Sequence, residues 1–136
     1  MKALTRDRTV SLLALVFAVG CSRTEPLVNP PRQEFAPPLA TDQVEAVVVE
    51  CLNRKGWVPT REGSTTIRGT LKVRTHTAVV LIDYGEGWYE LRYLGSEDLR
   101  FWRTSDGRQG IHENYFVWVN ELMHDINLQL SAEPVR

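Results

Sequence analysis

Residues 77–84 read T-A-V-V-L-I-D-Y, the most continuous apolar segment outside the N-terminus. In an extended strand successive side chains point to opposite faces, and here both faces would be apolar. A strand of this kind is expected in the interior of a sheet. We therefore predict that the sheet is built around this strand, with Ala78, Val80, Ile82 and Tyr84 on one face and Val79 and Leu81 on the other.

Two alternating segments predict the neighbours of this strand. Residues 65–74 alternate apolar residues with Thr, Arg and Lys, and residues 88–94 alternate Tyr and Leu with Trp, Glu and Arg. A tight reversal at Thr75-His76 and a glycine-containing loop at residues 85–87 would join the three strands as hairpins. The three segments therefore predict an antiparallel arrangement with one core face.

Two further segments can extend this sheet. A turn at residues 95–96 would lead into a fourth strand over residues 98–103, through Leu99 and Phe101. Residues 57–60 contain a proline, which fits only an edge strand or a crossover.

Apolar residues with a period of 3.6 predict one helix on each side of the sheet. The first begins near residue 41, where Asp42 can act as N-cap with Glu45 three residues on, and Gly56 can end it in the left-handed conformation. The second begins at His112 or Glu113 and runs for about 17 residues. The expected inward-facing residues are Val44, Val47, Val48, Cys51 and Leu52 in the first helix, and Tyr115, Trp118, Val119, Leu122, Ile126 and Gln129 or Leu130 in the second, flanked by Phe116 and Met123.

These elements predict an α+β fold in a single small domain over residues 41–131. The expected order is helix, antiparallel four-stranded meander, helix, with both helices on one face of the sheet. About 90 residues are enough for one small core and not for two. The other face of the sheet would be left to water or to a partner.

The N-terminus has the organisation of an export signal. Three basic residues precede the apolar run of residues 10–19. About ten apolar residues suit the core of a signal peptide, whereas a membrane-spanning helix needs roughly 20. The run ends in A-V-G-C at residues 18–21, which resembles the lipobox of bacterial lipoproteins, with Ala18 where leucine is commoner.

That resemblance implies cleavage before Cys21, a diacylglycerol thioether on its sulfur and acylation of the new amino group. Several acyl chains anchor a protein firmly, whereas one chain binds only marginally. Ser22, and not Asp, follows the cysteine, which by the same resemblance favours the periplasmic leaflet of the outer membrane. The alternative is an ordinary secreted protein with a chance cysteine at the cleavage site.

A proline-rich segment follows the cysteine. Residues 22–40 hold five of the seven prolines of the chain. Such a segment favours extended polyproline-II geometry, and could hold the domain up to ~60 Å from the anchor. The alternative is a partner-docking segment that uses the prolines and Phe35. The expected organisation is thus a signal peptide at residues 1–20, the lipidated cysteine and linker at residues 21–40, and the globular domain at residues 41–131.

Several stretches of the domain carry a resemblance to a known group of proteins. They are C-L-N-R-K-G-W-V (51–58), T-I-R-G-T-L-K-V (66–73), R-T-H-T-A-V-V-L-I-D-Y (74–84), G-W-Y-E-L-R-Y (87–93) and I-H-E-N-Y-F-V-W-V-N-E-L-M-H-D-I (111–126). With them the chain resembles small uncharacterised lipoproteins of Gram-negative bacteria. The resemblance implies a lipid-anchored envelope protein with this element order, and it adds no activity and no catalytic residue.

Charge and cysteine content narrow the function classes. Without residues 1–20 the chain has thirteen basic and sixteen acidic residues, a net charge of −3. A chain with a negative net charge has no overall electrostatic attraction to nucleic acid. With Cys21 lipidated, Cys51 remains alone and no internal disulfide can form. We interpret Cys51 as a small buried apolar residue. A reactive thiol influenced by Arg54 and Lys55 is the alternative.

The residues that could support catalysis do not form a recognisable motif. His76, His112 and His124 have neither metal-ligand spacing nor a carboxylate partner at such spacing. The carboxylate pairs at residues 83/86 and 97/98 lie at expected turns, where turn chemistry explains them. We therefore predict no metal, no cofactor and no enzymatic activity.

The outward face of the predicted sheet carries basic residues around an aliphatic centre with one tryptophan. Trp and Arg are frequent anchors in binding sites, so this face suits an envelope protein or an anionic ligand. The alternative is a solvated face whose apolar residues are covered by the linker, a terminus or a second copy. The predicted binding face consists of Arg68, Lys72, Arg74, Leu81, Trp88 and Arg92, with Val79 beside Leu81.

The sequence thus leads us to expect a non-enzymatic interaction or accessory module anchored in the outer membrane. The alternative is a lipoprotein that binds a small ligand such as a lipid, glycan or peptide. Its pocket would lie between the sheet and the helices, lined by Tyr89, Tyr93 and Trp118.

Overall fold

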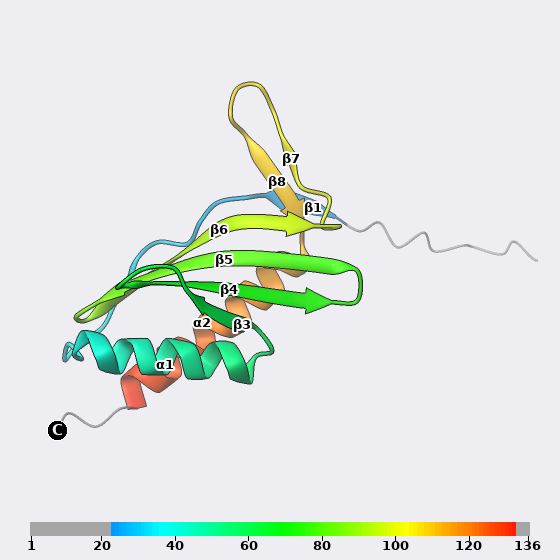
Figure 1. The fold of residues 1–136 in the computed structure, drawn as a ribbon. Coiled ribbons are helices and arrows are strands. Elements are labelled where there is room, and N and C mark those ends of the chain that lie inside the picture. Colours follow the sequence, from blue (N-terminus) through cyan, green and yellow to red (C-terminus); the bar gives the residue numbers. More distant parts are fainter. Residues whose placement is uncertain (1–22, 133–136) are drawn as a thin grey trace, which may run out of the picture.

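The computed structural model describes residues 23–132, which are organised around a five-stranded antiparallel sheet (Figure 1). β5 (His76–Gly85) lies at its centre between β4 (Thr66–Val73) and β6 (Trp88–Glu97). β3 (Val58–Arg61) forms one edge beside β4, and β2 (Gln33–Glu34) forms the other beside β6. The predicted interior position of residues 77–84 and the edge position of the proline-containing strand are confirmed.

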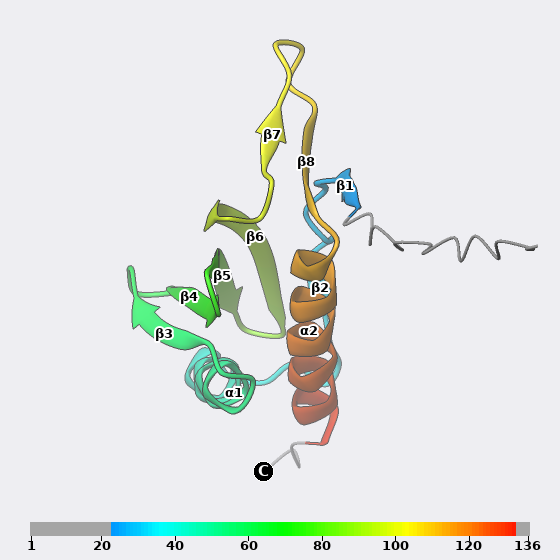
Figure 2. The ribbon, with the colours of Figure 1, turned by 90° about the vertical axis from the view of Figure 1, so that its right-hand side faces the viewer.

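Two helices cover one face of this sheet. α1 (Thr41–Arg54) and α2 (Asn114–Ala132) lie on the same side of it, as Figure 2 shows. Their apolar residues recur with the helical period and point into the core, as predicted. Trp118, by contrast, is half-buried. The buried helix residues are Val44, Val47, Val48, Cys51 and Leu52 in α1, and Tyr115, Val119, Leu122, Met123, Ile126 and Leu130 in α2.

The start of α1 differs from the predicted capping arrangement. Ala40 occupies the N-cap position, and its backbone N–H donates to Gln43 Oε1 at 3.1 Å. Asp42 lies inside the first turn, where a negative charge still favours the helix N-terminus. The prediction of an Asp42–Glu45 capping box is therefore wrong. At the other end Gly56 has a φ of +84°, and the predicted glycine stop is confirmed.

A second, three-stranded antiparallel sheet stands beside the first. It consists of β1 (Thr24–Pro26), β8 (Gln109–His112) and β7 (Trp102–Arg103), in that order. The β7–β8 hairpin projects from the body of the molecule, and α2 follows β8 directly (Figures 1 and 2). The α+β class is confirmed, but the single four-stranded meander is wrong, because residues 98–103 do not extend the large sheet.

A β-bulge explains why the chain leaves the large sheet later than predicted. Val79 pairs with Gly95 whereas Val80 pairs with Tyr93, so Leu94 is an extra residue on β6. β6 therefore passes through the predicted turn at residues 95–96 and continues to Glu97. The chain then changes direction at residues 98–100, where Asp98 and Arg100 have φ values of 52° and 51° and Leu99 between them is buried.

The segment predicted to be a linker is part of the folded domain from residue 23 onwards. β1 pairs with β8 and β2 pairs with β6, and the side chain of Leu39 is buried in the core. Asn29 Oδ1 also accepts a hydrogen bond from the Tyr93 N–H at 2.8 Å. Prolines prevent long strands, but they allow short edge strands of this kind. The predicted linker is therefore wrong for residues 23–40, while the signal peptide and Cys21 lie outside the described residues.

Candidate interaction surface

The face of the five-stranded sheet that points away from α1 and α2, here called the open face, brings three of the predicted binding residues together. Arg68, Leu81 and Arg92 are register partners across β4, β5 and β6, so they form one row. Side chains at register partners lie on the same face and within contact range of one another. Leu81 is half-buried between the two arginines.

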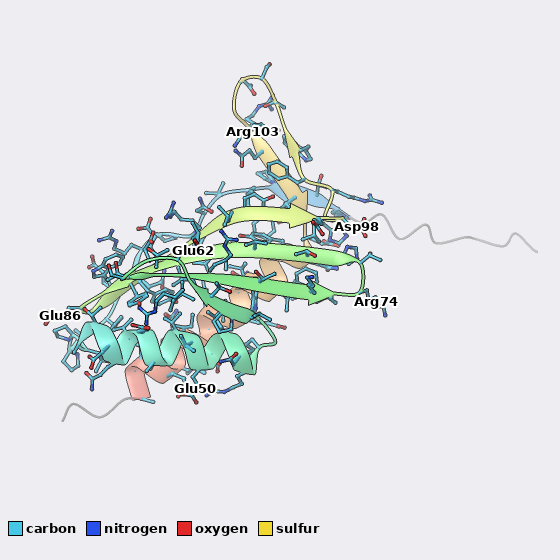
Figure 3. All side chains as sticks on the ribbon, viewed as in Figure 1. Glu50, Glu62, Arg74, Glu86, Asp98 and Arg103 are labelled. Atoms are coloured by element: carbon cyan, nitrogen blue, oxygen red, sulfur yellow. The ribbon has the colours of Figure 1, made fainter. Side chains whose placement is uncertain are left out.

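The other three predicted residues are not part of this row. Trp88 pairs with Gly85 and Lys72 pairs with Thr77, eight residues apart on β5, which corresponds to about 27 Å along the strand. Arg74 belongs to the turn between β4 and β5, because Val73 pairs directly with His76. The turn is thus one residue earlier than predicted. Figure 3 shows Arg74 at this end of the sheet. The six residues therefore do not form one compact site.

Ion pairs balance the charge of the open face. Arg92 Nη2 lies 2.6 Å from Asp83 Oδ2, and Arg68 Nε lies 2.5 Å from Glu62 Oε1. The second contact does not have the alignment of a hydrogen bond, so it is an ion pair only. Since both arginines face carboxylates, an isolated anion gains less here than the predicted basic patch suggests.

The carboxylate of Asp83 has a structural explanation. Partial burial acts to raise its pKa, but hydrogen bonds from Thr66 Oγ1 at 2.7 Å and Arg92 Nη2 at 2.6 Å outweigh this effect. The pKa of Asp83 is therefore lowered, and the group stays ionised at neutral pH. It links β4 to β6 across the central strand.

Trp88 is held in place by its neighbours. The guanidinium of Arg32 lies 3.9 Å from the centre of a Trp88 ring, a cation–π contact. On β5, Gly85 leaves space for the indole, since a Cβ at Gly85 would lie 2.5 Å from Trp88 Nε1. Arg32 also pairs with Glu90 at 3.4 Å. The sequence missed Arg32 because it lies in the segment predicted to be a linker.

An apolar strip on the open face is the feature that best suits a partner. Val79 lies beside Leu81, and the row of Val79 continues through Thr70 on β4 to Val58 on β3, which is 62% exposed. Leu94, in the bulge beside Gly95, is 43% exposed. The apolar strip thus consists of Val58, Val79, Leu81 and Leu94, with the Arg68 and Arg92 ion pairs beside it. Val58 lies in a strand whose alternation is too short to assign a face from sequence.

The tyrosines of the predicted pocket are packed side chains. Tyr89 is fully buried, its hydroxyl donates to Asn127 Oδ1 at 2.7 Å, and burial raises its pKa. The Tyr93 hydroxyl bonds to Ser96 Oγ at 2.8 Å, and its ring stacks on Phe101 with centroids 5.3 Å apart. Both tyrosines therefore join elements of the fold.

Cys51 is buried in α1, as predicted. Burial, with a hydrogen bond to Asp125 as a second cause, raises the pKa of the thiol to about 12. A thiol with such a pKa holds its proton at neutral pH and is a poor nucleophile. The structure thus favours the inert residue over the reactive alternative.

Two of the three histidines, His76 and His112, have local partners, and His124 lies on the exposed side of α2. His76 Nδ1 lies 3.3 Å from Asp98 Oδ2, and its ring centre lies 6.5 Å from that of His112. His112 Nδ1 accepts a hydrogen bond from the Asn114 N–H at 3.1 Å, at the junction of β8 and α2. Within residues 23–132 no group of three or more His, Cys, Asp or Glu side chains is arranged to hold a metal ion.

Comparison with known proteins gives no match: no family model, curated protein or solved structure is similar enough to this chain to place it. Neither α1 nor α2, the helices of the described part of the chain, has the length and hydropathy of a membrane-spanning helix.

Proposed function

We propose that this protein is a lipid-anchored, non-enzymatic interaction module of the Gram-negative cell envelope, held at the periplasmic leaflet of the outer membrane through Cys21. The lipobox-like A-V-G-C at residues 18–21 and Ser22 after it support the anchor. The single observation that supports the interaction role is the apolar strip on the open face. Val58 and Leu94 stay exposed beside the half-buried Val79 and Leu81, and apolar side chains that gather at a surface often mark an interaction site.

The partner of the open face is a protein surface. The centre of the strip is aliphatic, and the arginines beside it are paired with carboxylates, which resembles the apolar core and polar rim of a protein interface. A small anion, by contrast, would have to compete with Asp83 and Glu62 for the two arginines. The strip is short, which suits a transient contact rather than a permanent complex.

Site-specific photo-crosslinking in cells tests the interaction. A photoreactive residue at position 81 should give a discrete protein adduct that mass spectrometry can identify. The matched control is position 117 on α2, because Val117 is 50% exposed but lies on a different surface. A lipid or glycan adduct at position 81 would favour the small-ligand alternative. Equal labelling from both positions, or none from position 81, would contradict the assignment of the open face.

The anchor has an independent test. The intact mass of the protein from a Gram-negative host should lack residues 1–20 and carry a diacylglyceryl group and an amide-linked acyl chain. The Cys21→Ser variant should carry neither addition. An unmodified cysteine in the wild-type protein would rule out the anchor and leave the secreted alternative.

A further inference from the structure

The three-stranded sheet carries a surface that the open face does not account for. Residues 99–112, which include the β7–β8 hairpin, together with residues 23–26, which include β1, are here called the arm. The arm stands out from the large sheet and the two helices, as Figures 1 and 2 show. Within the arm, β8 pairs with β1, which lies at the start of the described part of the chain. Leu99 and Ile111 at the base of the arm are buried in the core, whereas the hairpin beyond them projects from the domain.

Exposed apolar groups gather on the arm. Trp102 is 38% exposed and Phe101 is 40% exposed, and next to the arm Val28 is 74% exposed. The Trp102 indole lies across Gly110, and its Nε1 donates to Thr24 Oγ1 at 3.4 Å. The ring is thereby fixed to the surface of the sheet beside a hollow of about 250 Å³, which is also lined by Val28 and Arg108.

The arm also differs in charge from the rest of the domain. It holds four arginines against two carboxylates, a net charge of +2. The remaining described residues, 27–98 and 113–132, hold eight basic against thirteen acidic residues, a net charge of −5. Arg103 is exposed, and Figure 3 shows it on the arm. Arg108 pairs with Asp106 at 3.0 Å, while its side chain stays 74% exposed. A negatively charged surface would therefore attract the arm and repel the rest.

The covalent chain limits the distance between the predicted anchor and the base of the arm. Thr24 pairs with His112 in the arm, and Cys21 precedes Thr24 by three residues. Three residues span at most about 11 Å. An acyl group on Cys21 would therefore hold the base of the arm, where Thr24 pairs with His112, close to the headgroup layer, and the hairpin projects from that base.

We propose that the arm docks onto the anionic phospholipid headgroups of the membrane in which the protein is anchored. This inference rests on the proposed lipid anchor at Cys21. Tryptophan prefers the membrane interface, where its ring is partly apolar and its N–H is polar. Each basic residue near an anionic leaflet strengthens binding by about fivefold. The docked arm would hold the domain in one orientation, with the acidic remainder away from the lipid.

The test uses the full-length chain, matured in a Gram-negative host and reconstituted into vesicles. A polarity-sensitive fluorophore is attached at Ser105→Cys, in the loop between β7 and β8. The control label is at Glu86→Cys, in the loop between β5 and β6, which Figure 3 places at the far end of the large sheet. Buried Cys51 does not compete for the label. The vesicles contain either phosphatidylcholine alone or phosphatidylcholine with phosphatidylglycerol.

We expect the emission from position 105 to shift to the blue, and its quenching by iodide to fall, only in vesicles that contain phosphatidylglycerol. Position 86 should respond in neither. The double variant Arg103→Ala/Arg108→Ala should lower the ratio of docked to undocked arm roughly 25-fold, the product of two fivefold losses. The matched variant Lys55→Ala/Lys72→Ala removes the same charge elsewhere and should leave the ratio unchanged.

The outcomes separate this proposal from the anchor on which it rests. If the intact mass shows acylated Cys21 but position 105 does not respond to phosphatidylglycerol, the docking is overturned and the anchor stands. Equal shifts in neutral and anionic vesicles would overturn the role of the arginines. An unacylated Cys21 would overturn the anchor and the docking together. A crosslink in cells from position 105 to a protein, and not to lipid, would assign the arm to a protein partner instead.

Discussion

At the scale of single residues, the contact that joins the two helices is the most informative. Asp125 of α2 accepts hydrogen bonds from Arg54 Nη1 of α1, at 3.1 Å to Oδ1 and 3.0 Å to Oδ2. Its side chain is only 13% exposed, whereas Glu50, the other partner of the same arginine, is 65% exposed. Asp125 also influences Cys51 of α1, since its carboxylate helps raise the pKa of the thiol. One carboxylate thus acts on two groups of the facing helix.

Asp125→Ala should lower the free energy of unfolding by about 1–3 kcal/mol, because it removes the largely buried acceptor of the charged hydrogen bonds from Arg54. Glu50→Ala is the matched control, since it removes an exposed partner of the same arginine and should cost about 0.5 kcal/mol or less. Urea denaturation measures both. Equal costs would mean that the junction of α1 and α2 does not depend on Asp125.

The raised pKa of Cys51 should appear as a pH dependence of stability. The unfolded thiol loses its proton near its ordinary pKa of 9.0, whereas the folded thiol keeps it to about pH 12. The unfolded state then binds fewer protons, so stability is full below pH 9 and falls as the pH rises. From pH 9 to 10 the loss should be about 1 kcal/mol. Above pH 10 the buried tyrosines Tyr89 and Tyr115, whose pKa values burial also raises, add to the loss.

The Cys51→Ala variant provides the comparison for this titration. In this variant the free energy of unfolding should no longer fall between pH 9 and 10, whatever its absolute value. The native wild-type thiol should also react with a thiol reagent much more slowly than the same thiol in urea. A wild-type slope that matches the variant, or fast labelling of the native protein, would place Cys51 at the surface.

At the scale of elements, strong periodic patterns were predictable and irregular ones were not. The alternation in β4, β5 and β6 and the helical period in α1 and α2 reflect burial of whole faces, which sequence records directly. The bulge at Leu94 leaves no such record, because Gly95-Ser96 is as compatible with a turn as with a bulge. The prediction of the binding face was likewise correct only where it depended on a regular pattern. Register placed Arg68, Leu81 and Arg92 in one row, but the partners Arg32 and Glu62 depend on tertiary contacts.

The arm provides an element-scale test of its own packing. In Gly110→Ala the added Cβ would overlap the Trp102 indole, so the ring must leave its place across β8. We expect a changed Trp102 fluorescence and faster amide exchange at residues 109–112, with a loss of less than about 1 kcal/mol in global stability because the arm is peripheral. Gly95→Ala is the control, since nothing lies within 4 Å of a Cβ there. An unchanged Trp102 signal in Gly110→Ala would contradict the described position of the indole.

At the scale of the whole molecule, the main correction concerns residues 23–40. Their prolines and low content of apolar residues are typical of a linker, and sequence alone cannot separate a free extended segment from one that adds short strands to two sheets. The structure places this segment along β8 and then along β6, with Leu39 in the core just before α1. It therefore connects the two sheets. An anchored domain of this kind would sit directly at the membrane instead of far from it.

Leu39 tests whether this segment belongs to the cooperative domain. Its side chain is 4% exposed, and its carbonyl accepts a hydrogen bond from the Gly87 N–H at 3.2 Å. Leu39→Ala should therefore cost about 2–4 kcal/mol, as for other buried leucines. Val28 lies in the same segment but is 74% exposed. Val28→Ala should therefore change the free energy of unfolding by less than about 0.5 kcal/mol. Chemical denaturation, followed by fluorescence and circular dichroism, should show one shared transition whose midpoint falls only in Leu39→Ala. If both variants were neutral, the segment would lie outside the folding unit, and an anchor at Cys21 would no longer constrain the arm.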